Sequence, residues 1–136
     1  MDLMKSLLIA ASGLKTQSGR MRIIAENIAN ADSTAQTPGG DPYRRKIPTF
    51  KSELDRTHGV ERVALDKIML DKGDFGERYE PGHPAANAAG YVMTSNVNGL
   101  VESIDMGQAQ RGYEANLNVI NTSRRMLNAT IELLRR

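Results

Sequence analysis

The sequence predicts a mainly α protein with a small β-rich insertion, in which long N- and C-terminal helices pack as an antiparallel coiled-coil-like pair. Apolar residues recur at alternating steps of three and four near both ends of the 136-residue chain, whereas short apolar runs and Gly/Pro turns fill its middle. We therefore divide it into an N-terminal helix at 1–33, a loop and β-rich insertion at 34–95, and a C-terminal helix at 96–136.

The two terminal stretches share an apolar period of 3.5 residues. Its members are Leu7, Ala11, Leu14, Ser18, Met21, Ala25 and Ile28 at one end, and Tyr113, Leu117, Ile120, Arg124, Leu127, Ile131 and Leu134 at the other. This period is typical of a helix that packs along a seam on another helix. With the chain ends level, Leu7 faces Leu134 and Ile28 faces Tyr113. Ser18 and Arg124 then share a polar layer, which would fix the register. The alternative is two unrelated amphipathic helices that each cover a sheet.

Local signals set the expected boundaries of the elements. We expect a helix at 3–30, a turn-rich loop at 34–42, an extended segment at 43–50, a polar stretch at 51–59, a strand at 60–70 with a short helix as the alternative, turns at 71–74 and 80–84, and strands at 75–79 and 91–93. Asn98 is a good N-cap for the final helix, and Glu102 and Asp105 complement its positive dipole end. We expect that helix to bend between Gly107 and Gly112.

Composition narrows the function classes. The chain has no cysteine, which excludes thiolate sites and disulfides, and its net charge of +2 is too small to indicate a nucleic-acid partner. No stretch approaches the roughly 20 apolar residues of a membrane-spanning helix. Lys5 followed by the apolar residues 7–11 imitates a signal peptide, but the apolar run is short and its period continues to Ile28. We interpret it as mature helix, so that any export would proceed without a cleaved signal peptide.

No catalytic, cofactor or metal site is predicted. His58 and His83 lie in separate turns, where exposed loop histidines are a better interpretation than a two-histidine metal site with Asp or Glu. Three consecutive basic residues, Arg44, Arg45 and Lys46, lack a glycine-rich cradle. We therefore expect a solvated or subunit-facing basic patch rather than a phosphate site.

Several motifs along the chain resemble those of bacterial flagellar basal-body rod proteins, and of the proximal-rod members in particular. They are residues 29–33 leading through a Gly/Pro loop into Tyr43-Arg44, the segment YEPGHP at 79–84, Gly90-Tyr91-Val92, Asn96-Val97-Asn98, and the terminal motif at 113–122. The resemblance covers the whole length of the chain. It implies a structural subunit of the periplasmic rod that assembles helically with copies of itself and other rod proteins, and passes unprocessed through the flagellar export apparatus.

Apolar and amide side chains outside the predicted seam are the candidates for contacts between subunits. These candidates are Leu3, Leu8, Ile23, Ile24, Asn27 and Asn30 on the first helix, and Asn116, Val119, Asn121, Met126 and Leu133 on the second. In a rod they would be covered by neighbouring subunits and would help to transmit torque and line the export channel. The competing interpretation is a helical-hairpin adaptor or regulatory binding module. An enzyme is disfavoured because no site was found.

Overall fold

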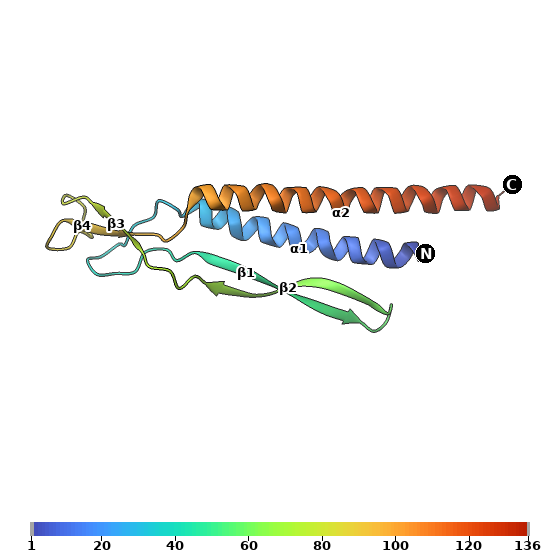
Figure 1. Ribbon diagram of the computed structural model, residues 1–136, viewed down its shortest axis with the longest axis horizontal. Coiled ribbons are helices and arrows are strands. Elements are labelled where there is room, and N and C mark those ends of the chain that lie inside the picture. The colour runs from blue at the N-terminus through green and yellow to red at the C-terminus, as the bar shows by residue number, and fades with distance from the viewer. Residues whose placement is uncertain (1, 136) are drawn as a thin grey trace. The chain divides into compact units, whose positions relative to one another are not determined.

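The computed structural model describes residues 2–135, which form a mixed α/β structure. Its elements are α1 (Leu3–Ala29), β1 (Lys46–Asp55), β2 (Val60–Leu70), β3 (Gly76–Tyr79), β4 (Tyr91–Thr94) and α2 (Gly99–Leu134), as Figure 1 shows. Strands β1 and β2 pair in one two-stranded sheet, and β3 and β4 pair in another. Helices hold 47% of the residues and strands 22%. The prediction of a mainly α protein is therefore wrong, because the middle of the chain contributes two sheets.

The bounds of β1 and β2 show which strands the local sequence pattern could predict. β2 is a strand over residues 60–70, so the alternative of a short helix is wrong. β1 continues through residues 51–55, where we expected only a polar stretch. Most of these residues are exposed, and a strand exposed to water on both faces needs no alternation of apolar and polar side chains. The hydrophobic pattern therefore could not reveal it.

Side-chain caps begin both helices. The carboxylate of Asp2 accepts hydrogen bonds from the backbone N–H groups of Met4 and Lys5, at 3.1 and 3.3 Å. Asn98 Oδ1 accepts from the N–H groups of Leu100 and Val101, at 3.0 and 3.3 Å, which confirms the predicted N-cap. α2 is helical without interruption from Gly99 to Leu134, including Gly107 and Gly112.

The chain folds as two compact units, and each contains part of both terminal helices. Unit 1 comprises residues 1–21, 49–67 and 107–136, and unit 2 comprises residues 22–48 and 68–106.

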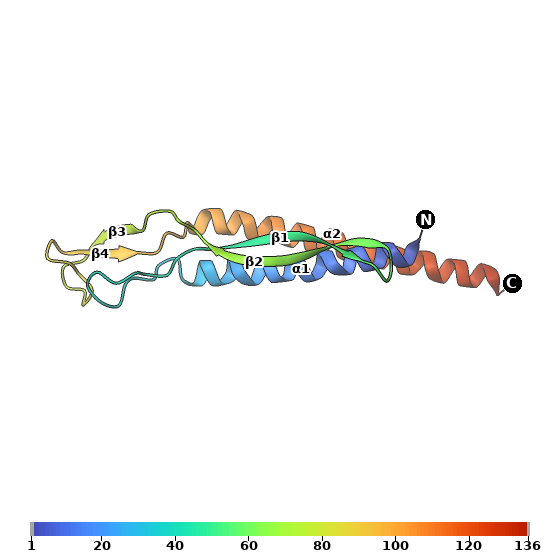
Figure 2. The ribbon, with the colours of Figure 1, turned by 90° about the horizontal axis from the view of Figure 1, so that it is seen from below.

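In unit 1 the two helices touch through glycine. A methyl group at Gly13 of α1 would come within 2.7 Å of the Asn116 side-chain amide on α2. A methyl group at Gly112 would lie 3.1 Å from the Gln17 side chain. The Asn116 amide is itself fixed, because its Nδ2 donates a hydrogen bond of 2.9 Å to the Gly112 carbonyl. Because Gly13 and Gly112 have no side chain, the amides of Asn116 and Gln17 fit between the helices. The two helices lie side by side at this contact in both Figure 1 and Figure 2.

These contacts show that the predicted register is wrong. The residue numbers of the pairs Gly13–Asn116 and Gln17–Gly112 add to 129, whereas those of the predicted pairs add to 141 or 142. The difference of about twelve residues corresponds to a sliding of roughly 18 Å at 1.5 Å per residue. Leu14 therefore does not face Leu127, and Ser18 does not share a layer with Arg124. A regular heptad pattern fits several registers, and the small residues in the contact selected another one.

Burial confirms that the helices use a different face from the predicted seam. None of the fourteen seam residues is buried: Leu7, Leu14, Met21, Tyr113, Ile120 and Leu127 are half-buried, and Ala11, Ser18, Ala25, Ile28, Leu117, Arg124, Ile131 and Leu134 are exposed. The buried helical residues include Ala10, Thr16, Ala109 and Ser123, all of them small or polar. The prediction followed the large apolar side chains, but of the ten in the seam six are only half-buried and four are exposed.

Strand β2 packs against α1 within unit 1. The Thr16 hydroxyl donates a hydrogen bond of 3.1 Å to the Val63 carbonyl, and the Leu65 side chain occupies the space beside Gly19. At the end of the hairpin, Asp55 Oδ2 lies 2.7 Å from both His58 Nδ1 and Arg62 Nη2. The hydrogen bond from His58 is the main reason why the pKa of Asp55 is lowered. His58 thus belongs to a turn, in an acid–base cluster that orders the loop.

Unit 2 holds a small sheet with an alanine-rich core. β3 pairs antiparallel with β4 from Gly76–Thr94 to Tyr79–Tyr91, and residues 33–35 add hydrogen bonds along the other edge of β4. Ala35, Ala85 and Val92 form the buried cluster. Gly90 has a φ of +85°, and a methyl group there would lie 2.8 Å from the Tyr79 ring. Only glycine fits both conditions.

Candidate functional site

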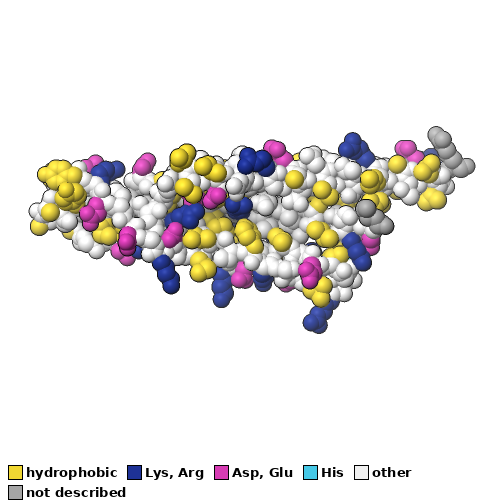
Figure 3. Space-filling view, viewed as in Figure 1, with side chains coloured by type: hydrophobic (Ala, Val, Ile, Leu, Met, Phe, Trp, Pro, Cys, Tyr) yellow, Lys and Arg dark blue, Asp and Glu magenta, His cyan; other side chains and the backbone are white. Residues whose placement is uncertain are grey.

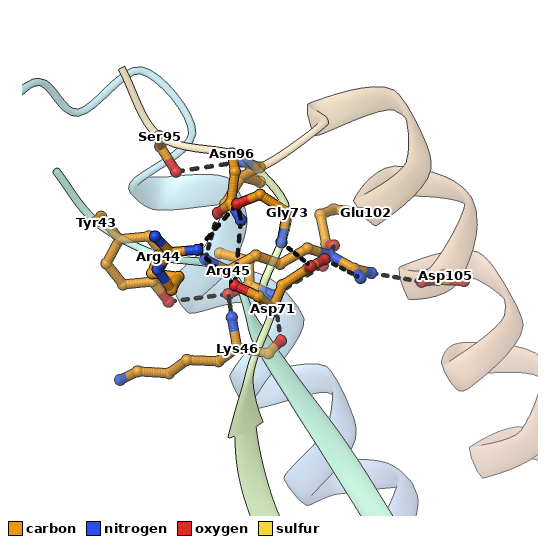
Figure 4. Close-up of polar contacts among 12 residues, drawn as sticks. Tyr43, Arg44, Arg45, Lys46, Asp71, Gly73, Ser95, Asn96, Glu102 and Asp105 are labelled. Atoms are coloured by element: carbon orange, nitrogen blue, oxygen red, sulfur yellow. Dashed lines mark hydrogen bonds and ion pairs between the residues drawn. The ribbon is translucent and has the colours of Figure 1, made fainter. Parts of the chain in front are cut away.

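A network of polar side chains joins the middle of the chain to both helices within unit 2. We name this network the polar junction; its members are Asn27, Tyr43, Arg44, Arg45, Lys46, Asp71, Asn96, Glu102 and Asp105, most of which are labelled in Figure 4. They come from α1, from the segment before β1 and its first residue, from the residues after β2, from the residues before α2, and from the first turns of α2. The junction thus connects segments far apart in sequence.

Arg45 is the centre of the charges in the polar junction. Its Nε donates to Glu102 Oε1 at 2.5 Å, and its two terminal nitrogens lie 3.5 Å from Asp71 Oδ2 and 3.6 Å from Asp105 Oδ2. Burial acts to lower the pKa of Arg45, but Glu102 and Asp71 more than offset it and the pKa is raised. The side chain of Glu102 is completely buried, so Arg45 supplies the compensating charge for a carboxylate without water.

Asn27 uses every hydrogen-bonding position of its amide. Nδ2 donates to the Lys46 carbonyl at 2.8 Å and to Glu102 Oε2 at 3.0 Å. Oδ1 accepts from the Tyr43 hydroxyl at 2.9 Å and from the Lys46 N–H at 3.0 Å. Two donors and two acceptor positions are the full capacity of this side chain. We predicted Asn27 as a subunit-interface residue; instead it is buried within its own subunit.

Arg44, Arg45 and Lys46 all interact with other groups of unit 2. Arg44 Nη1 donates to the carbonyls of Asp71 and Gly73, at 2.8 and 2.9 Å, and its guanidinium lies 4.0 Å from the centre of the Phe75 ring. Lys46 forms an ion pair with Glu26. The expected solvated basic patch is therefore wrong, because all three cations have partners in the same unit. Asn96 completes the arrangement by accepting from the Arg45 N–H at 2.7 Å.

The junction also changes the acidity of Tyr43. Burial, and then the negative charges of Glu26 and Glu102, raise its pKa to about 12. The phenol therefore stays protonated and donates to Asn27 well above the pH at which a free tyrosine ionises.

The subunit-interface candidates divide into three groups by exposure. Ile23, Ile24 and Asn27 are buried, Leu3, Leu8, Asn30 and Asn116 are half-buried, and Val119, Asn121, Met126 and Leu133 are exposed. Val119, Met126 and Leu133 follow one another at seven-residue steps and so share a face of α2. We call these three residues the outer stripe. Figure 3 shows hydrophobic side chains exposed along α2.

The histidine and carboxylate side chains of the described residues do not gather into a metal site. No group of three or more His, Asp or Glu side chains in residues 2–135 could hold a metal ion. His83 contacts the Thr34 hydroxyl at 3.3 Å and accepts from the Ala85 N–H. Within the same range, no helix has the combination of length and apolarity that crossing a bilayer needs. The candidate functional surface is therefore the set of apolar side chains that are exposed on α2.

Comparison with known proteins identifies the family. A family model described as "Flagella basal body rod protein" matches residues 7–35, and one described as "Flagellar basal body rod FlgEFG protein C-terminal" matches residues 88–133. The chain is 56% identical to the flagellar basal-body rod protein FlgC of Agrobacterium fabrum, over 93% of this chain and 91% of that protein. It is 37% identical to FlgC of Salmonella typhimurium, over 92% of both chains, and 35% identical to FlgC of Bacillus subtilis, over 94% and 95%.

The chain belongs to the FlgC family. It is therefore a structural subunit of the flagellar basal-body rod, with rod proteins as its partners and the basal body as its location. The predicted resemblance and the prediction of a non-enzymatic function are both confirmed. Tyr43, Arg44 and Asn96, which belong to segments that the sequence analysis compared with rod proteins, are members of the polar junction.

Arg45→Met should lower the free energy of unfolding by about 3 kcal/mol, because it leaves the carboxylate of Glu102 buried without a cation. Urea denaturation followed by circular dichroism measures the loss. Arg78→Met is the matched control, since Arg78 and Glu80 form an exposed pair at 3.1 Å, and it should cost less than about 1 kcal/mol. Adding Glu102→Met to Arg45→Met should recover part of the loss. Equal losses for the two arginines would contradict the central role of Arg45.

The stability of the chain should fall as pH rises from about 10 to about 12, since the pKa of Tyr43 is about 12 when folded and 10 in its ordinary state. In this interval the unfolded chain has lost a proton that the folded chain keeps, so the linkage destabilises the folded state. Urea midpoints across the interval measure the slope. Tyr43→Phe should flatten it, and an unchanged slope would show that the phenol of Tyr43 is not held protonated.

Proposed function

We propose that this rod subunit assembles helically through its terminal helices, with copies of itself and with other rod proteins. In that assembly the packed helices transmit torque and line the channel through which flagellar proteins are exported. The observation that supports the proposal most strongly is the outer stripe, because its three large apolar residues are exposed on the isolated subunit. Apolar surface of this regularity on an assembling protein is best explained by a neighbouring subunit.

The small contact face between α1 and α2 supports the same proposal. Gly13, Gly112 and Ala109 let the helices pack within the subunit without large apolar side chains. Much of the large apolar surface of α2 thus remains available for neighbours. Heterologous contacts that do not close then produce a tubular polymer. Asn121 lies exposed beside this surface, and its amide can make polar contacts across it.

We also propose export through the flagellar export apparatus without a cleaved signal peptide. Residues 7–11, which imitate the apolar core of such a peptide, lie inside α1, and Ala10 is buried there. Cleavage after this run would remove helical residues that form part of unit 1.

Replacing Val119 and Met126 by aspartate should abolish swimming and prevent formation of hook–basal bodies, because each new charge would have to be buried between subunits. The variant replaces the natural gene in a motile strain, and swimming zones and isolated basal bodies are scored. Both positions are exposed, so the purified variant should keep its helical content.

Asn118→Asp with Asn128→Asp is the control, since it adds the same charge at two exposed polar positions of α2. Cells with the control should swim. Normal swimming with Val119→Asp/Met126→Asp would refute assembly through the outer stripe.

A further inference from the structure

The last turns of α2 extend past the start of α1. In unit 1, Gly13 lies opposite Asn116 and Gln17 opposite Gly112, so Leu3, the first residue of α1, falls opposite residue 126. Residues 127–134 are helical but have no turn of α1 beside them, as Figures 1 and 2 both show. We call this segment the overhang.

The contact face of α2 changes character where α1 stops. Where α1 covers it, this face includes Ala109, Gly112, Asn116 and Ser123, which are small or polar, and the half-buried Ile120. The same spacing of three and four continues through Leu127, Ile131 and Leu134, where the contact face and the predicted seam, which differ near Gly112, converge on the same residues. In the overhang the face is thus made of large apolar residues, of which Ile131 is 55% and Leu134 83% exposed. The contact face of α2 thus becomes more hydrophobic beyond the end of α1, which indicates that another helix or subunit covers it.

A second exposed apolar cluster lies at the other end of α2, in unit 2. Leu100, Val101 and Ile104 are 72%, 44% and 56% exposed, and their spacing places them on one side of the helix. We call these three residues the α2 start. Two helical apolar faces of this kind can pack on each other by interdigitating side chains.

Charge favours a contact between the overhang and the α2 start over one between two overhangs. Unit 1 has twelve Lys or Arg and seven Asp or Glu, a net charge of +5, whereas unit 2 has six and nine, a net charge of −3. The overhang is flanked by Arg124, Arg125 and Arg135, with Glu132 as its only acidic residue. Two overhangs would repel each other, and unit 1 of one copy would attract unit 2 of another.

We propose that the overhang of one subunit docks on the α2 start of a second copy of this chain. The contact is heterologous, so each added copy leaves one overhang and one α2 start free, and the contact repeats without closing. Its few side chains bury less than the roughly 800 Å² per partner of a standard interface, so a single pair is weak and the contact acts together with others in the rod. This inference rests on the proposed function and specifies which surfaces meet.

The experiment measures self-association of the full chain by sedimentation velocity over a concentration series. Ile131→Ser/Leu134→Ser disables the overhang, and Leu100→Ser/Ile104→Ser disables the α2 start. Each should weaken association on the order of 100-fold, because two buried aliphatic side chains are lost from the contact. Phe50→Ser/Leu54→Ser removes two exposed apolar residues of β1 and should leave association unchanged. Circular dichroism verifies that all variants keep their helices.

An equimolar mixture of the two disabled variants is the decisive sample. One variant keeps its α2 start and the other keeps its overhang, so the mixture should form 1:1 pairs that grow no further. Pairing should weaken at high salt, because opposite net charges attract the two units. A mixture that stays monomeric, or an α2-start variant that associates like the unchanged chain, overturns the inference.

The remaining outcomes separate this inference from the proposed function. If both disabled variants associate as strongly as the unchanged chain, the inference is wrong while helical assembly stands. If the unchanged chain stays monomeric at every concentration, a second copy is not the occupant of the overhang. The outer-stripe variants in cells then still test rod assembly on their own.

Discussion

The contact between α1 and α2 in unit 1 depends on residues that have almost no side chain. Gly13 and Gly112 each leave room for an amide from the opposite helix, and Ala10 and Ala109 are buried with them. Small residues let helices approach closely, and such a contact fixes register because only particular positions can accept the opposing side chain. Glycine in a helix costs about 1 kcal/mol relative to alanine, and here the close contact offsets that cost. Large apolar side chains of α2, such as those of the outer stripe, consequently stay exposed on the isolated subunit.

The polar junction gives unit 2 a different kind of specificity. Its buried carboxylate, amide and guanidinium are paired with one another, so a shift of any contributing segment would leave a buried group without a partner. Asn27 and Arg45 therefore determine how the middle of the chain returns to α1 and α2. A buried charge network of this kind favours one arrangement more than it adds stability. For a subunit that must present defined surfaces to its neighbours, a single arrangement is what matters.

Sequence reasoning succeeded where the signal is local. The cap at Asn98, the strand at 60–70 and the turn at 80–84 are set by residues within a few positions, and all are present. It failed on the helix register, because the large residues of the heptads satisfy several alignments and the deciding residues were glycines. It also assigned Glu102 only to the helix dipole. Its pairing with Arg45, 57 positions away, has no signature in spacing.

The register of α1 against α2 is the claim that most of this account requires, and disulfide trapping tests it most directly. The chain contains no cysteine, so a pair introduced by Gly13→Cys and Asn116→Cys reports on one contact only. We predict rapid formation of an intramolecular disulfide in the purified monomer, and none for Ser18→Cys with Arg124→Cys. A disulfide at positions 18 and 124, without one at positions 13 and 116, would contradict the register and the overhang derived from it.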